Sequence, residues 1–201
     1  MQYIAGIDEV GRGPIAGPLT VCCAWIEKSQ AQKILRKLKK EGLTDSKKLS
    51  KKKREYFAGI AQQLKKEGRL DYACISISAL RIDTVGLSVV IKKAIKNAIK
   101  IKAPSKNISI FLDGRLKAPA IFTNQKTIIK GDLKIPIISL ASIIAKVHRD
   151  AYMQKLHKKY PLYGFDTHVG YGTKKHYLAI KKHGLTPLHR KTWISAKSLI
   201  Y

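Results

Sequence analysis

Four carboxylates stand where a folded chain could gather them around a cation. Asp8 and Glu9 end an apolar stretch just before a glycine-rich turn, and Asp113 ends a second apolar stretch. Asp132 follows a glycine ahead of a long helical pattern. Several carboxylates in one place repel one another unless a cation neutralises them, and hard oxygen ligands suit Mg²⁺ or Mn²⁺. The pattern indicates a divalent metal site. With a phosphodiester as substrate, two such ions activate a water and stabilise the leaving oxygen.

Each of these acids also has a plainer interpretation as a cap or turn residue. Adjacent residues of a regular strand point to opposite faces, so Asp8 and Glu9 share an ion only if the strand twists or ends there. The acids that stand among lysines fit neutralising surface charges: they are Glu27, Glu41, Glu55, Glu67 and Asp71. The sequence alone does not show that the other four converge.

The charge balance points to a polyanionic partner. The chain of 201 residues has 40 Lys plus Arg against 13 Asp plus Glu, a net charge of +27. No basic stretch has the bulky apolar face of a helix that lies on a membrane, so nucleic acid is the favoured partner. The plainer alternative is that the lysines follow the composition of an AT-rich genome.

The sequence lacks the patterns of a zinc site, a signal peptide and a membrane-spanning segment. The three cysteines, Cys22, Cys23 and Cys74, lack zinc-site spacing and fit buried apolar positions. The first residues lack a signal-peptide pattern, and the longest apolar stretch, 135–145, is too short to cross a bilayer. We expect a cytoplasmic protein with no membrane contact.

Apolar periodicity predicts an α/β fold in a single domain, residues 1–201. Strands are predicted at 3–10, 19–26, 73–77 and 108–112, with an irregular, possibly β segment at 121–129. Helices are predicted near 33–41, 51–66, 87–98, 139–160 and 174–182. Asp83 or Thr84 is the expected N-cap of the helix that begins near Leu87. Strands 3–10 and 19–26 should form a hairpin with an elaborate loop, and the strand–helix–strand order implies a sheet covered by helices.

A series of short motifs, in this order along nearly the whole chain, resembles the type 2 ribonucleases H, specifically bacterial ribonuclease HII. The motifs lie at Gly6–Pro14, Asp45–Ser50, Leu112–Gly114, Lys130–Asp132, Ala141–Asp150, His168–Tyr171 and His189–Arg190. The resemblance implies a ribonuclease H-like fold, a central mixed β-sheet flanked by helices with a C-terminal helical portion. It also places the family's catalytic, metal-binding carboxylates on Asp8, Glu9, Asp113 and Asp132.

The same resemblance implies a substrate-binding set. The loop of Gly11, Arg12 and Gly13 would sense the 2′-hydroxyl and phosphate of a ribonucleotide, because glycines allow close backbone approach and only RNA has that hydroxyl. Tyr171 would pack on the following deoxyribose, and Lys47 would contact a phosphate. The plainer interpretations are a tight turn, a loop anchor and a solvated charge, respectively.

Two further sets of residues have structural interpretations. Asp150 lies in a strong motif, yet one helical turn from Lys146 and Gln154 it is expected to pair rather than to bind metal. The histidines of the C-terminal motifs are expected to support the loop around Tyr171: they are His168, His176 and His189. The stretch 83–87 lacks an asparagine common in the family, which puts the geometry of helix entry in question.

The implied activity is cleavage of the RNA strand of RNA–DNA hybrids and of single ribonucleotides in duplex DNA. With two Mg²⁺ or Mn²⁺ ions, cleavage 5′ of the ribonucleotide would give a 3′-hydroxyl and a 5′-phosphate. We expect a monomer, and no motif names a protein partner. Two alternatives stay open: a basic RNA-binding protein without catalysis, and another nuclease on the same scaffold that does not need a 2′-hydroxyl.

Overall fold

The computed structural model describes residues 2–100 and 108–195. They form one mixed sheet of five strands in the order β3-β2-β1-β4-β5. The strands are β1 (Tyr3–Val10), β2 (Leu19–Glu27), β3 (Asp71–Ile77), β4 (Ile108–Asp113) and β5 (Gln125–Ile128). Neighbours β1, β2 and β3 are antiparallel, whereas β4 runs parallel to β1 and β5 parallel to β4.

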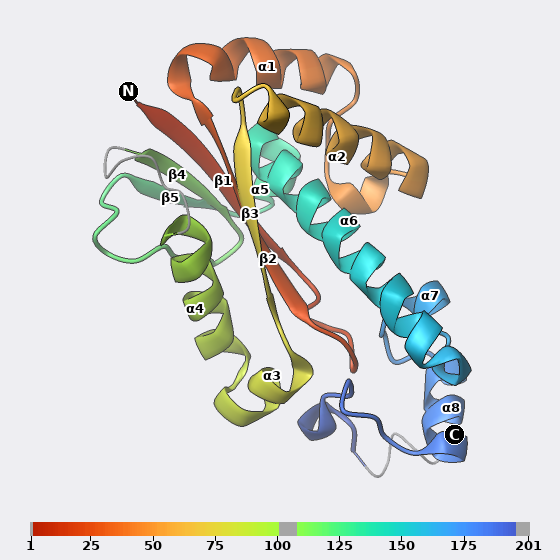
Figure 1. Ribbon diagram of the computed structural model, residues 1–201. Helices are drawn as coiled ribbons and strands as arrows, with labels where there is room; N and C mark the ends of the chain where they lie inside the picture. Colours follow the sequence, from red (N-terminus) through yellow and green to blue (C-terminus); the bar gives the residue numbers. More distant parts are fainter. Residues whose placement is uncertain (1, 101–107, 196–201) are drawn as a thin grey trace.

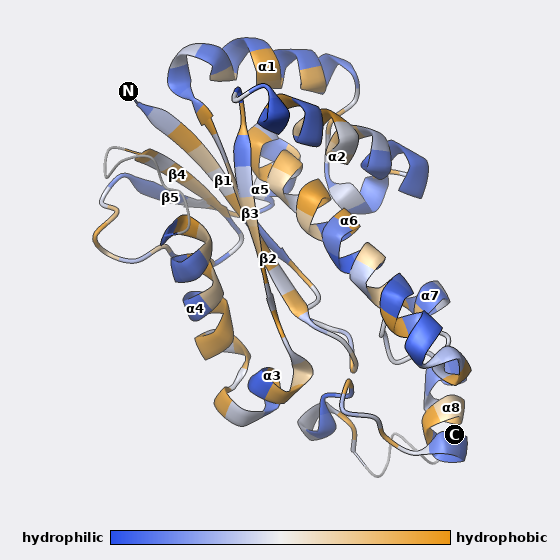
Figure 2. Cartoon of the chain, viewed as in Figure 1, coloured by the Kyte–Doolittle hydropathy of each residue, from blue (hydrophilic) through white to orange (hydrophobic). Residues whose placement is uncertain are grey.

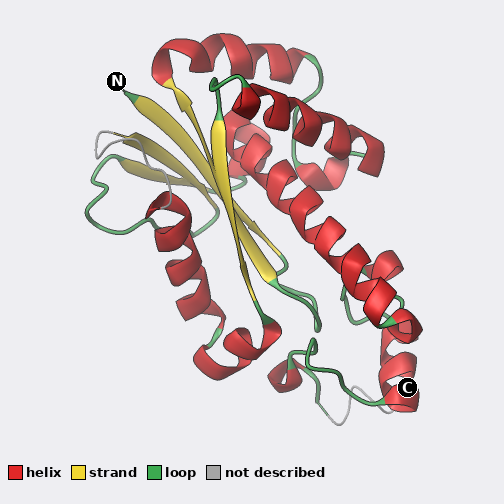
Figure 3. Cartoon of the chain, in the orientation of Figure 1, coloured by secondary structure: helices red, strands yellow, loops and turns green. Residues whose placement is uncertain are grey.

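Helices cover both faces of this sheet (Figures 1 and 3). The α-helices are α1 (Lys28–Lys40), α2 (Lys51–Lys66), α3 (Ala79–Val85), α4 (Leu87–Lys100), α5 (Gly131–Lys134), α6 (Pro136–Lys159), α7 (Phe165–His168) and α8 (Lys174–His183). Short 3₁₀ turns are η1 (Ser46–Lys48), η2 (Pro161–Tyr163) and η3 (Lys191–Trp193). Helices α1, α2 and α6 lie on one face, and α4 packs on the other.

The apolar core is divided by the sheet. One buried cluster joins one face of the strands to α4, and a second joins the other face to α1, α2 and α6. Strand β2 is central and buried on both faces, so its sequence is apolar almost throughout. Hydrophilic residues gather on the outer surfaces of α1 and α2 and toward the end of α6 (Figure 2).

Helix α6 links the sheet to the C-terminal segments. Its first half is buried against β1, where Gly6 lacks the side chain that would overlap the carbonyl of Ile137. Its second half continues beyond the sheet toward α7 (Figure 1). A third cluster, which includes Ile15, Met153 and Phe165, joins the β1–β2 loop to α6, α7 and α8. The C-terminal part is therefore packed against the loop that follows the first strand.

The predicted strands are confirmed, with β2, β3 and β4 extending slightly beyond the ranges predicted, and the hairpin of β1 and β2 is present. Within the irregular segment 121–129, only Gln125–Ile128 forms a strand. Helix α1 begins several residues earlier than predicted, at Lys28, and α6 begins at Pro136, since proline is tolerated in the first helical turn.

One prediction was wrong: neither Asp83 nor Thr84 caps α4. Both lie inside α3, and Gly86 at φ 82° separates α3 from α4. The carboxylate of Asp83 instead accepts hydrogen bonds from the backbone N–H of Lys191 at 2.7 Å and from Oγ1 of Thr192 at 2.6 Å. This acid joins α3 to the C-terminal segment, a contact between residues more than a hundred positions apart that no local pattern indicates.

Candidate active site

The parallel pairing of β1 and β4 brings their last residues to one edge of the sheet. The register pairs Ile7 with Leu112, so Asp8 and Asp113 are the next residues on adjacent strands. Asp8 is 6% exposed and lies beneath α6, near the hydroxyl of Ser142. Burial raises the pKa of Asp8 well above the ordinary value, repulsion by Glu9 and Asp113 raises it further, and the Ser142 hydroxyl lowers it. The side chain is therefore a desolvated carboxylate among other acids.

Glu9 follows Asp8 on the same strand and is held by a different partner. Its Oε1 forms an ion pair with Nε of Arg12, while Oε2 is buried and has no hydrogen-bond partner. Burial raises the pKa of Glu9 to about 7, Arg12 opposes this, and repulsion by Asp113 adds to it. Asp113 thus repels both adjacent acids of β1. At the end of β1, Asp8 and Glu9 therefore both lie near Asp113 of β4.

Asp132 reaches the same edge through a short turn after β5. The backbone N–H of Gly131 donates to Oδ1 of Asp113 at 2.7 Å, which fixes the turn beside β4. Asp132 is 8% exposed, and its pKa is raised by burial and then by repulsion from Asp113 and Asp45. Asp113 is therefore the common neighbour of the other three predicted carboxylates.

The donor set fits a hard divalent cation, since it consists of carboxylate oxygens with one buried oxygen atom lacking a partner. In the described part of the chain, however, no three acidic, cysteine or histidine side chains are close enough to hold one ion as they stand. Arg12 holds Glu9, and a backbone N–H holds Asp113. The Glu9 carboxylate is therefore not free for an ion while it pairs with Arg12.

The β1–β2 loop, residues 11–18, lies beside the carboxylates. Gly11 has φ 93°, and a Cβ there would lie 2.5 Å from Nε of Arg149 and 2.7 Å from the carbonyl of Pro18. A Cβ on Gly13 would lie 3.6 Å from Cε1 of Tyr171, a residue that is 46% exposed. The structure thus brings the predicted glycine loop and the predicted tyrosine together.

Lys47 lies in the turn η1. Its charge lowers the pKa of Asp132, which places it near that carboxylate. The turn is tied to α6 by a 3.0 Å hydrogen bond between the hydroxyls of Ser46 and Ser142. Ser142, whose hydroxyl lowers the pKa of Asp8, therefore lies between the lysine turn and the first carboxylate.

Three buried or half-buried histidines support the Tyr171 loop, as expected. The Thr186 N–H donates to Nδ1 of His189 at 2.9 Å, which leaves Nε2 of His189 to donate to Nε2 of His176 at 3.1 Å. Nδ1 of His176 then donates to the carbonyl of Tyr171 at 2.8 Å. His168 stacks on His176 at a ring distance of 4.3 Å. Burial lowers the pKa of both His176 and His189 to about 4, so this chain of neutral rings is intact at pH 7.

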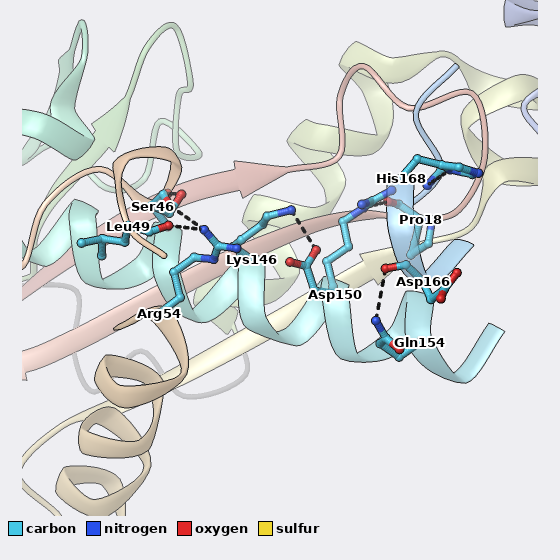
Figure 4. Close-up of polar contacts among 12 residues, drawn as sticks. Pro18, Ser46, Leu49, Arg54, Lys146, Asp150, Gln154, Asp166 and His168 are labelled. Atoms are coloured by element: carbon cyan, nitrogen blue, oxygen red, sulfur yellow. Dashed lines mark hydrogen bonds and ion pairs between the residues drawn. The ribbon is translucent and has the colours of Figure 1, made fainter. Parts of the chain in front are cut away.

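Asp150 lies away from the carboxylate edge and pairs with Lys146 at 2.8 Å, as predicted (Figure 4). Gln154, the other expected partner, donates instead to the carbonyl of Asp166. These residues line a depression of about 470 Å³ between α2, α6 and α7 that contains acidic and basic groups and none of the four metal-binding candidates. Arg54 closes one end by donating to the carbonyls of Ser46 and Leu49.

Two arginines, Arg149 and Arg190, hold the β1–β2 loop, a role that the sequence patterns do not predict. Both are fully buried and donate to its backbone carbonyls. Arginine is an exposed residue in most proteins, so neither composition nor periodicity identifies a buried one. Their positions inside two of the short motifs, at 149 and 190, were the one available signal.

Comparison with known proteins decides the family. A family model described as Ribonuclease HII matches residues 5–196. The chain belongs to the ribonuclease HII family. A ribonuclease HII of Shouchella clausii is 44% identical over 191 residues, which cover 94% of this chain and 68% of that protein. The activity shared by the family follows: the chain is a ribonuclease H, an enzyme that hydrolyses RNA in RNA–DNA hybrids.

Solved structures confirm the ribonuclease H-like fold. Ribonuclease H2 of Pyrococcus horikoshii is 29% identical with a TM-score of 0.74, covering 98% of this chain and 96% of that one. Ribonuclease HII of Archaeoglobus fulgidus, solved as a complex with PCNA, is 25% identical with the same TM-score, covering 96% of each chain. A Bst ribonuclease HIII solved in complex with Mn²⁺ is 18% identical with a TM-score of 0.71, covering 99% of this chain and 69% of that one, and shares the fold.

Proposed function

We propose that this ribonuclease cuts the RNA strand of hybrids and also cuts 5′ of a single ribonucleotide in duplex DNA, leaving a 3′-hydroxyl and a 5′-phosphate. The observation that supports the proposed site is the position of Asp113, whose charge repels Asp8, Glu9 and Asp132. Such a group of acids favours two Mg²⁺ or Mn²⁺ ions. The Mn²⁺ complex of the ribonuclease HIII neighbour is consistent with that preference.

The four carboxylates would hold the ions between β1, β4 and the turn before α6. When bound, such ions activate a water for in-line attack and stabilise the leaving oxygen. The protein contributes placement: Asp8 is buried beneath α6, and the Gly131 N–H orients Asp113. Glu9 is the mobile member, since it must exchange Arg12 for an ion. That exchange would free Arg12 to meet a phosphate.

Selection of a ribonucleotide would depend on the exposed elements that border the acids. The loop of Gly11, Arg12 and Gly13 offers backbone groups close to the carboxylates, and Tyr171 offers an aromatic surface beside Gly13. A 2′-hydroxyl both donates and accepts hydrogen bonds, so backbone groups can read it. Lys47, near Asp132, would contact a substrate phosphate.

One assay separates this function from its alternatives. The protein is incubated with Mg²⁺ or Mn²⁺ and, separately, a DNA duplex containing one ribonucleotide, an RNA–DNA hybrid and an all-DNA duplex. We expect cleavage of the first two substrates and none of the third. Binding without cleavage of any substrate would support a non-catalytic RNA-binding protein. Cleavage of the all-DNA duplex would support a nuclease that does not need the 2′-hydroxyl.

We infer further that residues 1–201 act as one catalytic unit, as a monomer in the cytoplasm. A single copy supplies all four carboxylates and the loop beside them, so the site needs no second copy. The cysteines are all unpaired, as is usual in a reducing compartment. Within the part of the chain that the structure describes, no helix is long and apolar enough to span a membrane. Size-exclusion chromatography with light scattering tests the oligomeric state.

A further inference from the structure

The guanidinium of Arg190 is buried against the backbone of the β1–β2 loop. Its Nη2 donates to the carbonyl of Gly11 at 2.7 Å and to that of Gly17 at 3.0 Å, and its Nη1 donates to the carbonyl of Arg12 at 2.9 Å. The backbone N–H of Arg190 donates to the carbonyl of Ile15 at 2.7 Å. One residue of the C-terminal segment thus binds four carbonyls of the loop that borders the catalytic acids.

The direction of these carbonyls fixes the direction of the amides beside them. The carbonyl of Gly11 shares a planar trans peptide with the N–H of Arg12, and the carbonyl of Arg12 shares one with the N–H of Gly13. Within such a peptide the C=O and N–H point in opposite directions. Two carbonyls turned toward Arg190 therefore turn the next two N–H groups away from it. Neither N–H donates a hydrogen bond within the described residues, and both residues are exposed.

The loop segment that carries these two amides lies between Glu9 and Tyr171. The Arg12 side chain pairs with Glu9, and a Cβ built on Gly13 lies 3.6 Å from the ring of Tyr171. Consecutive N–H groups that point outward form a concave donor surface that binds anionic oxygens. A nucleotide presents such acceptors in its phosphate and its 2′-hydroxyl.

We propose that Arg190 is a positioning residue for ribonucleotide selection, which holds two peptide planes so that the amides of Arg12 and Gly13 face the ribose and phosphate of the substrate. This inference rests on the proposed function. A guanidinium has five N–H donors in a fixed plane and can donate hydrogen bonds to three carbonyls at once. A lysine ammonium is a compact point charge without this planar arrangement. The role is therefore specific to arginine.

The surroundings of Arg190 keep its segment in place. Asp83 accepts from the backbone N–H of Lys191, and the guanidinium carbon lies 4.9 Å from the centre of the Trp193 ring. Burial lowers the pKa of Arg190 to about 10, so the group stays protonated at pH 7. Arg149 holds the other end of the loop through the carbonyls of Pro18 and Ala16. Burying two cations side by side costs folding free energy, which is consistent with a role beyond stability.

The test compares Arg190→Lys with Tyr163→Phe. Tyr163 donates to the carbonyls of His183 and Gly184 in the same C-terminal part and does not touch the loop carbonyls, so its variant is the control for lost stability. On a duplex with one ribonucleotide, we expect Arg190→Lys to lower kcat by about 100-fold, the effect of misplacing a reacting group by about 1 Å, with KM changed by less than about threefold. Tyr163→Phe should leave both constants unchanged.

A second measurement does not depend on catalysis. In ¹⁵N-labelled protein, the amide signals of Arg12 and Gly13 should move in Arg190→Lys and stay in place in Tyr163→Phe. Unchanged amide signals and kcat in a folded Arg190→Lys protein would overturn the proposal. If Arg190→Lys does not fold, Arg190→Gln, whose amide can serve one carbonyl, carries the same expectations. If the wild type cuts no ribonucleotide substrate, the proposed function fails, while the amide signals still decide whether Arg190 positions the loop.

Discussion

The backbone N–H of Gly131 donates a 2.7 Å hydrogen bond to Oδ1 of Asp113. This bond ties the end of β4 to the turn that carries Asp132, so it sets the spacing of two candidate ligands. It also restricts Asp113 to one orientation, although the charge of this side chain repels the buried acids around it. A substitution at Asp113 that keeps the hydrogen bond but removes the negative charge therefore separates the effect of orientation from the effect of charge repulsion.

The first prediction concerns Asp113→Asn. The asparagine Oδ1 can still accept from Gly131, so the turn should keep its structure, whereas the negative charge is lost. We expect no detectable cleavage of any substrate. In the presence of a chelator we expect the variant to melt at a higher temperature than the wild type. Its unfolding free energy should be larger by on the order of 1 kcal/mol, because repulsion among the buried acids is relieved. Added Mg²⁺ should stabilise the wild type more than the variant.

Glu55→Gln is the matched control, since Glu55 is an exposed acid on the surface of α2 that pairs with Lys51 at 4.0 Å and with no other cation among the described residues. This variant should keep full activity and the full stabilisation by Mg²⁺. A folded Asp113→Asn protein that still cuts the single-ribonucleotide duplex would remove Asp113 from the metal site.

The second prediction compares two glycines with almost the same backbone conformation. Gly11 has φ 93° and Gly42 has φ 95°, but only Gly11 lacks room for a Cβ, which would meet Arg149 and Pro18. Gly42→Ala should cost about 1 to 2 kcal/mol, the strain of a left-handed residue, and leave activity intact. Gly11→Ala should cost about 2 to 5 kcal/mol, because overlap is added to strain, and should lower kcat. Urea unfolding and initial rates check both. Equal losses of stability in the two variants would show that the loop can adjust to accommodate a Cβ at Gly11.

The strands and the long helices could be predicted from the sequence because their signals are local. Strand β2 is apolar almost throughout, and α2 repeats apolar residues at helical spacing, so each pattern specifies its own element. The position of Asp8 and Asp113 at strand ends could be predicted for the same reason. That they meet depends on β1 and β4 being parallel neighbours, which is a property of the sheet and not of either segment.

The contacts that could not be predicted join distant segments. Arg190 binds the carbonyl of Gly11 across 179 positions, and Asp83 binds Thr192 across 109. Backbone carbonyls are present at every residue, so the sequence cannot show which of them a buried arginine binds. Asp83 was misassigned as a helix cap because its local surroundings favour a cap, whereas tertiary contacts determine its use.

The third prediction is that the histidine chain makes folding stability depend on pH. His176 and His189 have pKa values of about 4 in the folded protein and about 6.5 when unfolded, so the unfolded state binds more protons between these values. Their contribution is complete above pH 6.5 and is lost as the pH falls toward 4. The raised pKa values of Asp8 and Glu9 act in the opposite sense, since they favour the folded state at low pH.

A substitution at His189 separates the contribution of the histidines to the pH dependence of stability from that of the carboxylates. Unfolding free energy measured in urea between pH 5 and 7 should rise less steeply with pH in His189→Gln than in the wild type. His183→Gln is the control, because His183 is exposed and outside the chain of rings that ends at Tyr171. It should keep the wild-type slope. Identical slopes in all three proteins would show that the buried rings do not control acid stability.

The last prediction concerns Lys47 as a phosphate contact. Binding is measured in the Asp113→Asn background, where the substrate stays intact, at several salt concentrations. About five phosphate contacts would give a slope of log affinity against log salt near −4 to −5, and removing one contact makes the slope smaller by about one. We expect that change for Lys47→Ala. Lys33→Ala, on the exposed face of α1, should leave the slope unchanged, since α1 lies on the sheet near the opposite ends of β1 and β2 from the acids (Figure 1). If Lys33→Ala lowers the slope as much as Lys47→Ala does, the salt dependence reflects the overall charge of +27 and not a defined contact at Lys47.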